Sequence, residues 1–215
     1  MRRTLASTIL LGVMLAVGAV VTPAGATTDT EPPRITFVPN PATPPPGPSG
    51  WYRDLSPFGT LPYVVDFVDP SGLRVVGCRG LLEFTYAPPT LLGTAFGFSA
   101  GVSVDGVHVL DCSATDQVGN VGVGPGSTPM PVTIRIDRTP PTVTCGRTHR
   151  VKVGQRVRLR ASVDDATSGP VSERVEIVFR ATQVGRFTAP VTGADIAGNE
   201  TVVACPYVVL PRGHH

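Results

Sequence analysis

This sequence of 215 residues has few features of a helix, no long apolar run after its first 26 residues, and little net charge to attract a charged partner. After the first 26 residues, no stretch of ten residues combines helical spacing of apolar side chains with an absence of glycine and proline. No later apolar run approaches the roughly 18 residues that a membrane helix needs. The formal net charge is only +2, which argues against a nucleic-acid partner.

The chain begins with the features of an export signal. Arg2 and Arg3 form a basic segment, and 13 apolar residues follow at 9–21. That run is short for a membrane span, and an Ala-Gly-Ala sequence ending at Ala26 suits signal peptidase. We predict cleavage after Ala26 and a secreted, extracellular protein without a membrane span; a retained anchor is the alternative. Removing residues 1–26 leaves 189, enough for one large or two small domains.

Glycine and proline are abundant, with 24 and 23 residues. The hydrophobic fraction of 41% is too high for a disordered chain, and valine dominates it. Short valine-rich runs between turn residues are typical of strands joined by tight turns. Residues 156–163 show the alternation most clearly, with Val157, Leu159, Ala161 and Val163 on one side. The sequence therefore predicts an all-β fold.

Four cysteines are present, at Cys78, Cys112, Cys145 and Cys205. An even number in an exported chain favours disulfides, and no pair has the Cys-x-x-Cys spacing of a zinc site. Three connectivities are open. If the chain forms two domains, only Cys78–Cys112 with Cys145–Cys205 keeps both bonds local.

Three landmarks recur in the same order: a proline pair before a β run, an acidic Ser-Gly turn, and Asp-x-x-Gly-Asn before valines. They occupy residues 31–37, 67–72 and 116–120 in the first copy, and 139–145, 163–169 and 195–199 in the second. Residues 27–138 hold six Arg and ten acidic residues, whereas residues 139–215 hold ten basic and six acidic ones. Both the repeat and the charge difference indicate two units.

Together with Gly50-Trp51-Tyr52 and the sequence from Ile136 to Pro140, these landmarks resemble the bacterial immunoglobulin-like modules of secreted and surface proteins. The resemblance covers about residues 32–208 and implies two tandem antiparallel β-sandwiches. We predict a signal peptide at 1–26, a linker at 27–31, domains at 32–138 and 139–210, and a tail at 211–215. The second domain is shorter and lacks the tryptophan.

The resemblance also places the cysteines on strands. It implies that Cys78 and Cys112 lie on neighbouring strands of one sheet. It further implies that Cys145 in the first strand of its domain and Cys205 in the last strand run side by side. Each bond would close a loop of tens of residues and stabilise its domain by roughly 3–4 kcal/mol.

In such a sandwich, the turn after the second strand and the turn before the last strand lie at the same pole. The second unit would gather Asp137, Asp164, Asp165, Asp195 and Asn199 there, and the first unit Asp29, Glu31, Asp69, Asp116 and Asn120. Carboxylate and amide oxygens from loops are the ligands of Ca²⁺, which the resemblance permits because related modules carry Ca²⁺ at their junctions.

We predict Asp137, Asp165, Asp195 and Asn199 as the metal ligands. The alternative is turn chemistry alone, because Asp and Asn side chains bond to their own backbone in turns. Ca²⁺ is the only cofactor that the sequence suggests.

One motif suggests catalysis. Ser99 lies in a Gly-x-Ser-x-Gly pattern, nine residues before His108. The nucleophile elbow of esterases needs a strand-to-helix turn, but the residues after Ser99 have a strand pattern. We therefore predict no catalytic residue and no enzyme; a small serine hydrolase is the distant alternative.

Basic residues within 149–160 predict an outward stripe that includes Arg156, Arg158 and Arg160. Such a stripe would attract anionic wall polymers or acidic polysaccharide, although a solvated strand face explains it equally well. We predict a monomeric, non-catalytic protein for extracellular binding or adhesion, or a structural spacer, with an unidentified protein or glycan partner. The alternative is an accessory protein that binds cell-wall polysaccharide.

Overall fold

The computed structural model describes residues 29–55, 59–87 and 92–212. The predicted signal peptide lies outside the described residues, as does most of the predicted tail. The described residues form strands and turns without a helix, which confirms the all-β prediction. Among them there is accordingly no helix with the length and apolarity to cross a membrane.

The chain divides into two compact units. The first extends to Pro44 and resumes over Asp54–Ile134, and the second combines Pro45–Arg53 with the residues from Arg135 onward. The proline-rich segment before Trp51 therefore groups with the second unit although it precedes most of the first. The predicted immunoglobulin-like identity and the predicted boundary between 138 and 139 stay predictions.

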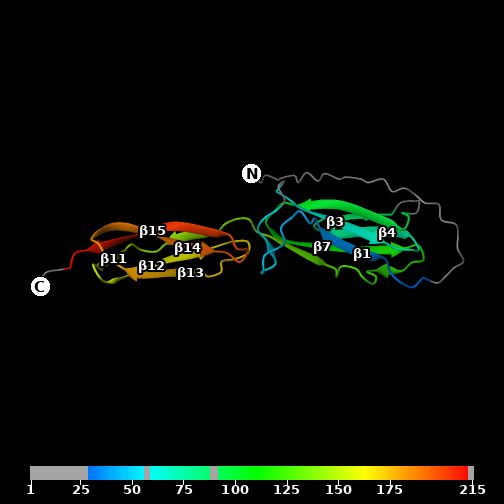
Figure 1. Ribbon diagram of the computed structural model, residues 1–215. Coiled ribbons are helices and arrows are strands. Elements are labelled where there is room, and N and C mark those ends of the chain that lie inside the picture. The colour runs from blue at the N-terminus through cyan, green and yellow to red at the C-terminus, as the bar shows by residue number, and fades with distance from the viewer. Residues whose placement is uncertain (1–28, 56–58, 88–91, 213–215) are drawn as a thin grey trace, which may run out of the picture. The chain divides into compact units, whose positions relative to one another are not determined.

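Most strands of the first unit belong to two sheets (Figure 1). One sheet has the antiparallel order β1-β3-β6, with β1 at Arg34–Pro39, β3 at Leu61–Val68 and β6 at Ala95–Val102. The other has the order β2-β9-β7-β4-β5, with β8 beside β7. Its strands are β2 (Trp51–Tyr52), β4 (Leu73–Gly80), β5 (Phe84–Tyr86), β7 (Gly106–Asp116), β8 (Val121–Gly122) and β9 (Val132–Ile136). Of these, β2 and the end of β9 from Arg135 onward group with the second unit.

Alternation along β3 shows how this unit builds its core. Leu61, Tyr63, Val65 and Phe67 are buried, while the residues between them point outward. The ring of Tyr63 lies 5.1 Å from that of Phe37 on β1, measured between centroids. Burial raises the pKa of the Tyr63 hydroxyl to about 12, because the phenolate would lose its hydration.

The second unit also has two sheets (Figure 1). One is antiparallel with the order β10-β12-β13, at Thr142–Cys145, Arg156–Asp164 and Arg174–Arg180. The other has the order β11-β15-β14, at His149–Lys152, Glu200–Leu210 and Gly185–Ala194. The alternation predicted for 156–163 is confirmed, because the four apolar residues of β12 are buried and its arginines are exposed.

Two disulfides are present, and each is local to its unit. Cys78 on β4 and Cys112 on β7 are directly opposed, with their Cα atoms 4.0 Å apart. Cys145 and Cys205 are also bonded, with Cα atoms 5.5 Å apart. The expectation that the strands of Cys145 and Cys205 run side by side in one sheet is wrong. Strand β10 pairs with β12, and β15 pairs with β11 and β14, so this bond joins the two sheets.

Candidate metal centres

Three aspartates from separate segments meet in the second unit. Asp137 follows β9, Asp165 follows β12 and Asp195 follows β14. Each offers one carboxylate oxygen, and these three oxygens lie within 4.8 Å of one another. Asp137 and Asp195 are buried, and Asp165 is half-buried. The structure thus brings together the three aspartates predicted as metal ligands, and the fourth predicted residue, Asn199, contacts two of them.

The same carboxylates hold the turns in shape. Oδ1 of Asp165 accepts hydrogen bonds from the backbone N–H groups of residues 167, 168 and 169, at 3.1, 3.0 and 2.9 Å. Oδ2 of Asp137 accepts the N–H of Ser168 at 3.0 Å, which ties the incoming segment to this turn. Oδ1 of Asp195 accepts the N–H of Asn199 at 2.8 Å. Turn chemistry, the alternative to metal binding, is therefore present in the cluster.

Asn199 acts in this structure as a hydrogen-bond donor. Its Nδ2 donates to Oδ2 of Asp195 at 2.9 Å and to the backbone oxygen of Asp137 at 3.0 Å. The side chain is buried and connects the closing turn to the segment that enters the unit. Its predicted role as a metal ligand stays untested, but the amide clearly fixes the position of two of the three aspartates.

The first unit repeats this construction. Asp29, Asp69 and Asp116 each offer a carboxylate oxygen, again within 4.8 Å of one another. Oδ1 of Asp116 accepts the N–H groups of residues 118, 119 and 120. Nδ2 of Asn120 donates to Oδ2 of Asp116 at 2.7 Å and to the backbone oxygen of Asp29 at 3.0 Å. In both copies of Asp-x-x-Gly-Asn, the Asn amide therefore connects the Asp carboxylate to the backbone of the incoming segment.

Two acidic residues expected at these poles lie outside the clusters. Asp164 is exposed at the end of β12, where it is opposite Thr142. Glu31 contributes its backbone oxygen to the amide of Asn120 at 3.4 Å, and its carboxylate is not part of the group.

The clusters have the donor chemistry that a hard cation requires. In the described parts of the chain, no arginine or lysine forms an ion pair with these six carboxylates. Buried like charges at this separation repel one another, and neither cluster includes a histidine or cysteine. Oxygen-only donors suit Ca²⁺ and do not suit zinc. Oδ2 of Asp165 accepts no hydrogen bond from a described residue, so both of its lone pairs are available.

Ser99 and His108 are not arranged as a nucleophile and its base. Ser99 lies within β6, opposite Val64 of β3, and not at the strand-to-helix turn that the esterase motif requires. His108 lies on β7 in the other sheet, and its Nε2 is 2.7 Å from the backbone oxygen of Val104.

The basic stripe predicted within 149–160 is divided between two sheets. Residues 149–152 form β11 and residues 156–164 form β12, which belong to opposite sheets of the unit. On β12, Arg158 and Arg160 both pair with Glu176, at 3.2 and 2.6 Å. The bond from Arg160 lowers the pKa of the Glu176 carboxyl. The expectation of one continuous stripe is wrong, because the chain changes sheet at residues 153–155.

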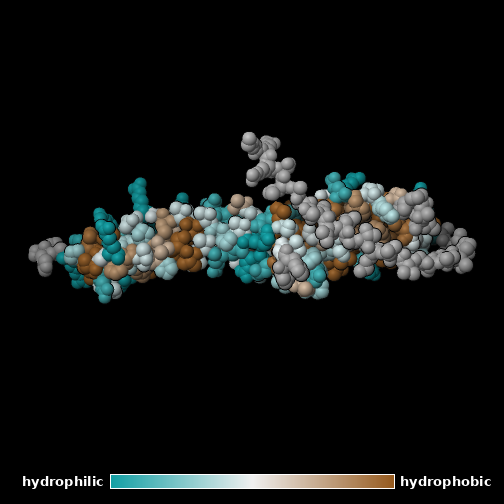
Figure 2. Space-filling view, turned by 90° about the horizontal axis from the view of Figure 1, so that it is seen from above, coloured by the Kyte–Doolittle hydropathy of each residue, from teal (hydrophilic) through white to brown (hydrophobic). Residues whose placement is uncertain are grey.

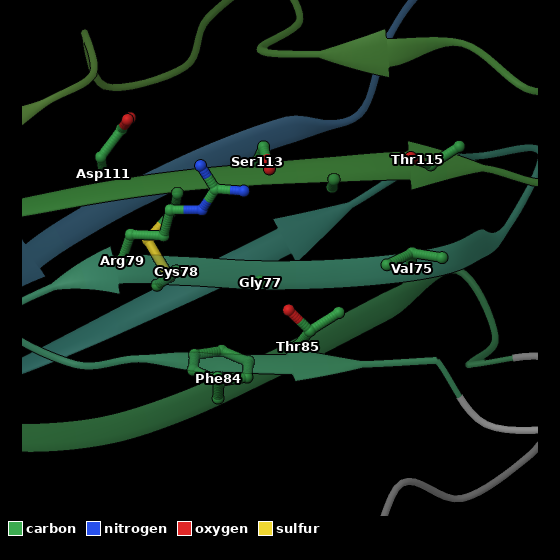
Figure 3. A pocket seen from close by; sticks show the side chains of 11 residues that line it. Val75, Gly77, Cys78, Arg79, Phe84, Thr85, Asp111, Ser113 and Thr115 are labelled. Carbon is green, nitrogen blue, oxygen red and sulfur yellow. A yellow bond between two sulfur atoms is a disulfide. The ribbon is translucent and has the colours of Figure 1, made fainter.

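A hollow of about 320 Å³ lies on the outer side of β4, β5 and β7 (Figure 3). Arg79 extends from β4 toward Ser113 of β7, Thr85 comes from β5, and Asp111 lies on β7 as well. Cys78 and Cys112 line part of it, but none of the predicted metal ligands does.

No protein-family model and no curated protein matches this chain. Among solved structures, it is similar to the sialic acid binding region of a Streptococcus sanguinis adhesin, with 13% identity and a TM-score of 0.27. That match covers 86% of this chain and 78% of the other. It is also similar to a Bacteroides ovatus protein, SGBP-B of a mixed-linkage glucan utilization locus, with 11% identity and a TM-score of 0.17 over 69% and 42% of the two chains. Neither likeness bears on ligand or mechanism.

Proposed function

We propose that this chain is a secreted, non-catalytic binding or spacer protein whose two β-sandwich units are stabilised by Ca²⁺ at their acidic clusters. The repeated cluster carries this proposal. In each unit, carboxylates from the incoming segment, the Ser-Gly turn and the closing turn converge within 4.8 Å. The carboxylates best suited to bind a metal ion therefore also hold chain segments together.

The disulfides support an extracellular setting. Structural disulfides form and persist in oxidising compartments, and each unit has one. Extracellular Ca²⁺ modules bind with dissociation constants of about 10⁻⁴–10⁻³ M, so their sites fill outside the cell. Bound Ca²⁺ would offset two of the three negative charges of Asp137, Asp165 and Asp195 and so fix three segments of the second unit to one another. That effect suits a protein that must stay rigid between binding partners.

Asp165→Asn separates calcium binding from turn chemistry. The substitution keeps an Oδ1 that accepts the three backbone N–H groups but removes the charge and the free Oδ2. In the wild-type chain, about 5 mM Ca²⁺ should stabilise the second unit by about 1–2 kcal/mol. Hydrogen exchange of the slowest β15 amides should then slow by roughly 5- to 30-fold. In Asp165→Asn, we expect the Ca²⁺ response of these amides to be lost.

Asp164→Asn is the matched control, because it removes the neighbouring charge from an exposed residue outside the cluster. It should keep the full Ca²⁺ response. If wild-type β15 exchanges at the same rate in Ca²⁺ and in EDTA, or if Asp165→Asn responds as the wild type does, the clusters serve the turns only and the proposal is wrong.

A further inference from the structure

An open groove of about 800 Å³ runs over the sheet β11-β15-β14 of the second unit. Its lining comes from all three strands and the residue before β11: Thr148, Arg150, Arg186, Phe187, Thr188, Pro206, Tyr207 and Val208. Two of these side chains are cationic, and none is acidic. On the face of this unit visible in Figure 2, long hydrophilic side chains stand beside apolar patches.

The two cations have a defined spacing. In the β-sheet register, Arg150 of β11 and Arg186 of β14 are both opposite Val208 of the central strand β15. They are therefore two strand spacings apart, roughly 10 Å between their backbones. Both are exposed, and in the described chain neither side chain has an ion pair or a hydrogen bond. Both guanidiniums are free to bind a ligand.

The surface between the cations is apolar, with hydroxyl groups at its rim. Val208 of β15 lies between the two arginines and Pro206 is opposite Thr188, while Thr148 and Thr188 add hydroxyl groups. An arginine binds a carboxylate through two parallel hydrogen bonds. The C–H face of a sugar ring fits an apolar floor, and sugar hydroxyls pair with threonine. This combination suits a ligand that is both acidic and rich in ring C–H and hydroxyl groups.

We propose that this groove binds a linear polysaccharide that carries carboxylates. The inference rests on the proposed extracellular role and gives that role a partner class. A polymer with one carboxylate in each disaccharide places successive charges about as far apart as Arg150 and Arg186. The arginines on the opposite sheet do not offer the same site, because Arg158 and Arg160 are paired with Glu176.

The test measures binding of the full mature chain to hyaluronate, a linear polysaccharide with one carboxylate per disaccharide, by calorimetry in EDTA. The double variant Arg150→Ala/Arg186→Ala should bind at least about tenfold more weakly than the wild type. Wild-type affinity should fall as salt is raised, because charge pairs on an exposed surface are screened. Neutral dextran should not bind.

Arg158→Ala/Arg160→Ala is the matched control, since it removes the same charge from the same unit on the other sheet. It should change hyaluronate affinity by less than about twofold. Equal losses in both double variants would mean that only the overall charge attracts the polymer, and this would overturn the proposed groove. Absence of wild-type binding to hyaluronate, or equal binding to dextran, would also overturn it.

Failure of this inference and failure of the calcium proposal give different results. The hyaluronate titrations contain EDTA, so they do not depend on Ca²⁺. Hydrogen exchange of β15 with and without Ca²⁺ can be repeated on Arg150→Ala/Arg186→Ala, whose substitutions are far along the strands from the acidic cluster. If the Ca²⁺ response is retained but the wild type does not bind hyaluronate, only the polysaccharide proposal is wrong.

Discussion

Cys145→Ala/Cys205→Ala is expected to lower the free energy of unfolding of the second unit by about 4 kcal/mol. The bond closes a loop with a sequence separation of 60 residues, and opening it restores that loop entropy to the unfolded chain. In the folded unit, the bond joins the sheet of β10 to the sheet of β15. The free energy of unfolding of a typical domain is only about 5–15 kcal/mol, so the variant should remain folded with little stability left.

Urea denaturation of the full chain, with hydrogen exchange of β15 to localise the effect, measures this loss. Cys78→Ala/Cys112→Ala is the matched control: it opens a loop of 34 residues in the first unit and should leave β15 exchange unchanged. A loss below about 1 kcal/mol for the Cys145 and Cys205 pair would show that sheet packing alone holds the second unit.

Asn199→Ala is expected to destabilise the second unit by about 2–3 kcal/mol without any change in charge. The substitution removes the Nδ2 donor that serves Oδ2 of Asp195 and the backbone oxygen of Asp137. Both aspartates are at most 1% exposed, so water does not readily replace the lost donor. The same measurements apply, and EDTA excludes any contribution from calcium.

Asn120→Ala in the first unit is the natural comparison. Asn120 makes the equivalent bonds to Asp116 and Asp29, but it is only half-buried. Water can therefore compensate in part, and we expect a smaller loss of about 1 kcal/mol. If both variants lose less than about 0.5 kcal/mol, the amide is not the link between the incoming segment and the closing turn.

The positions of the acidic clusters could be anticipated from the sequence because turn chemistry is local. Asp165 and Asp195 each bond to backbone groups within four residues, so a short motif encodes each turn. The resemblance to immunoglobulin-like modules then placed these turns at one pole. The sequence did not indicate that Asn199 acts as a donor, because an amide side chain carries both a donor and an acceptor.

The partner sheets of several strands could not be anticipated in the same way. The pattern of residues 149–160 predicted one basic stripe. The chain turns at 153–155, however, and β11 and β12 belong to opposite sheets. The Cys145 strand and the Cys205 strand likewise belong to different sheets. Strand pairing depends on contacts between distant residues, and alternation within a strand specifies only which of its faces is buried.

The sequence by itself determined the all-β class, the buried face of β12 and the acidic turns, since each follows from backbone preferences and side-chain alternation over a few residues. Only the tertiary structure decided that the Asn199 amide donates to the backbone oxygen of Asp137, that a disulfide joins the two sheets of the second unit, and that Arg150 and Arg186 flank Val208. These features join residues separated by 20 to 60 or more positions, and they exist only once the sheets have paired and packed.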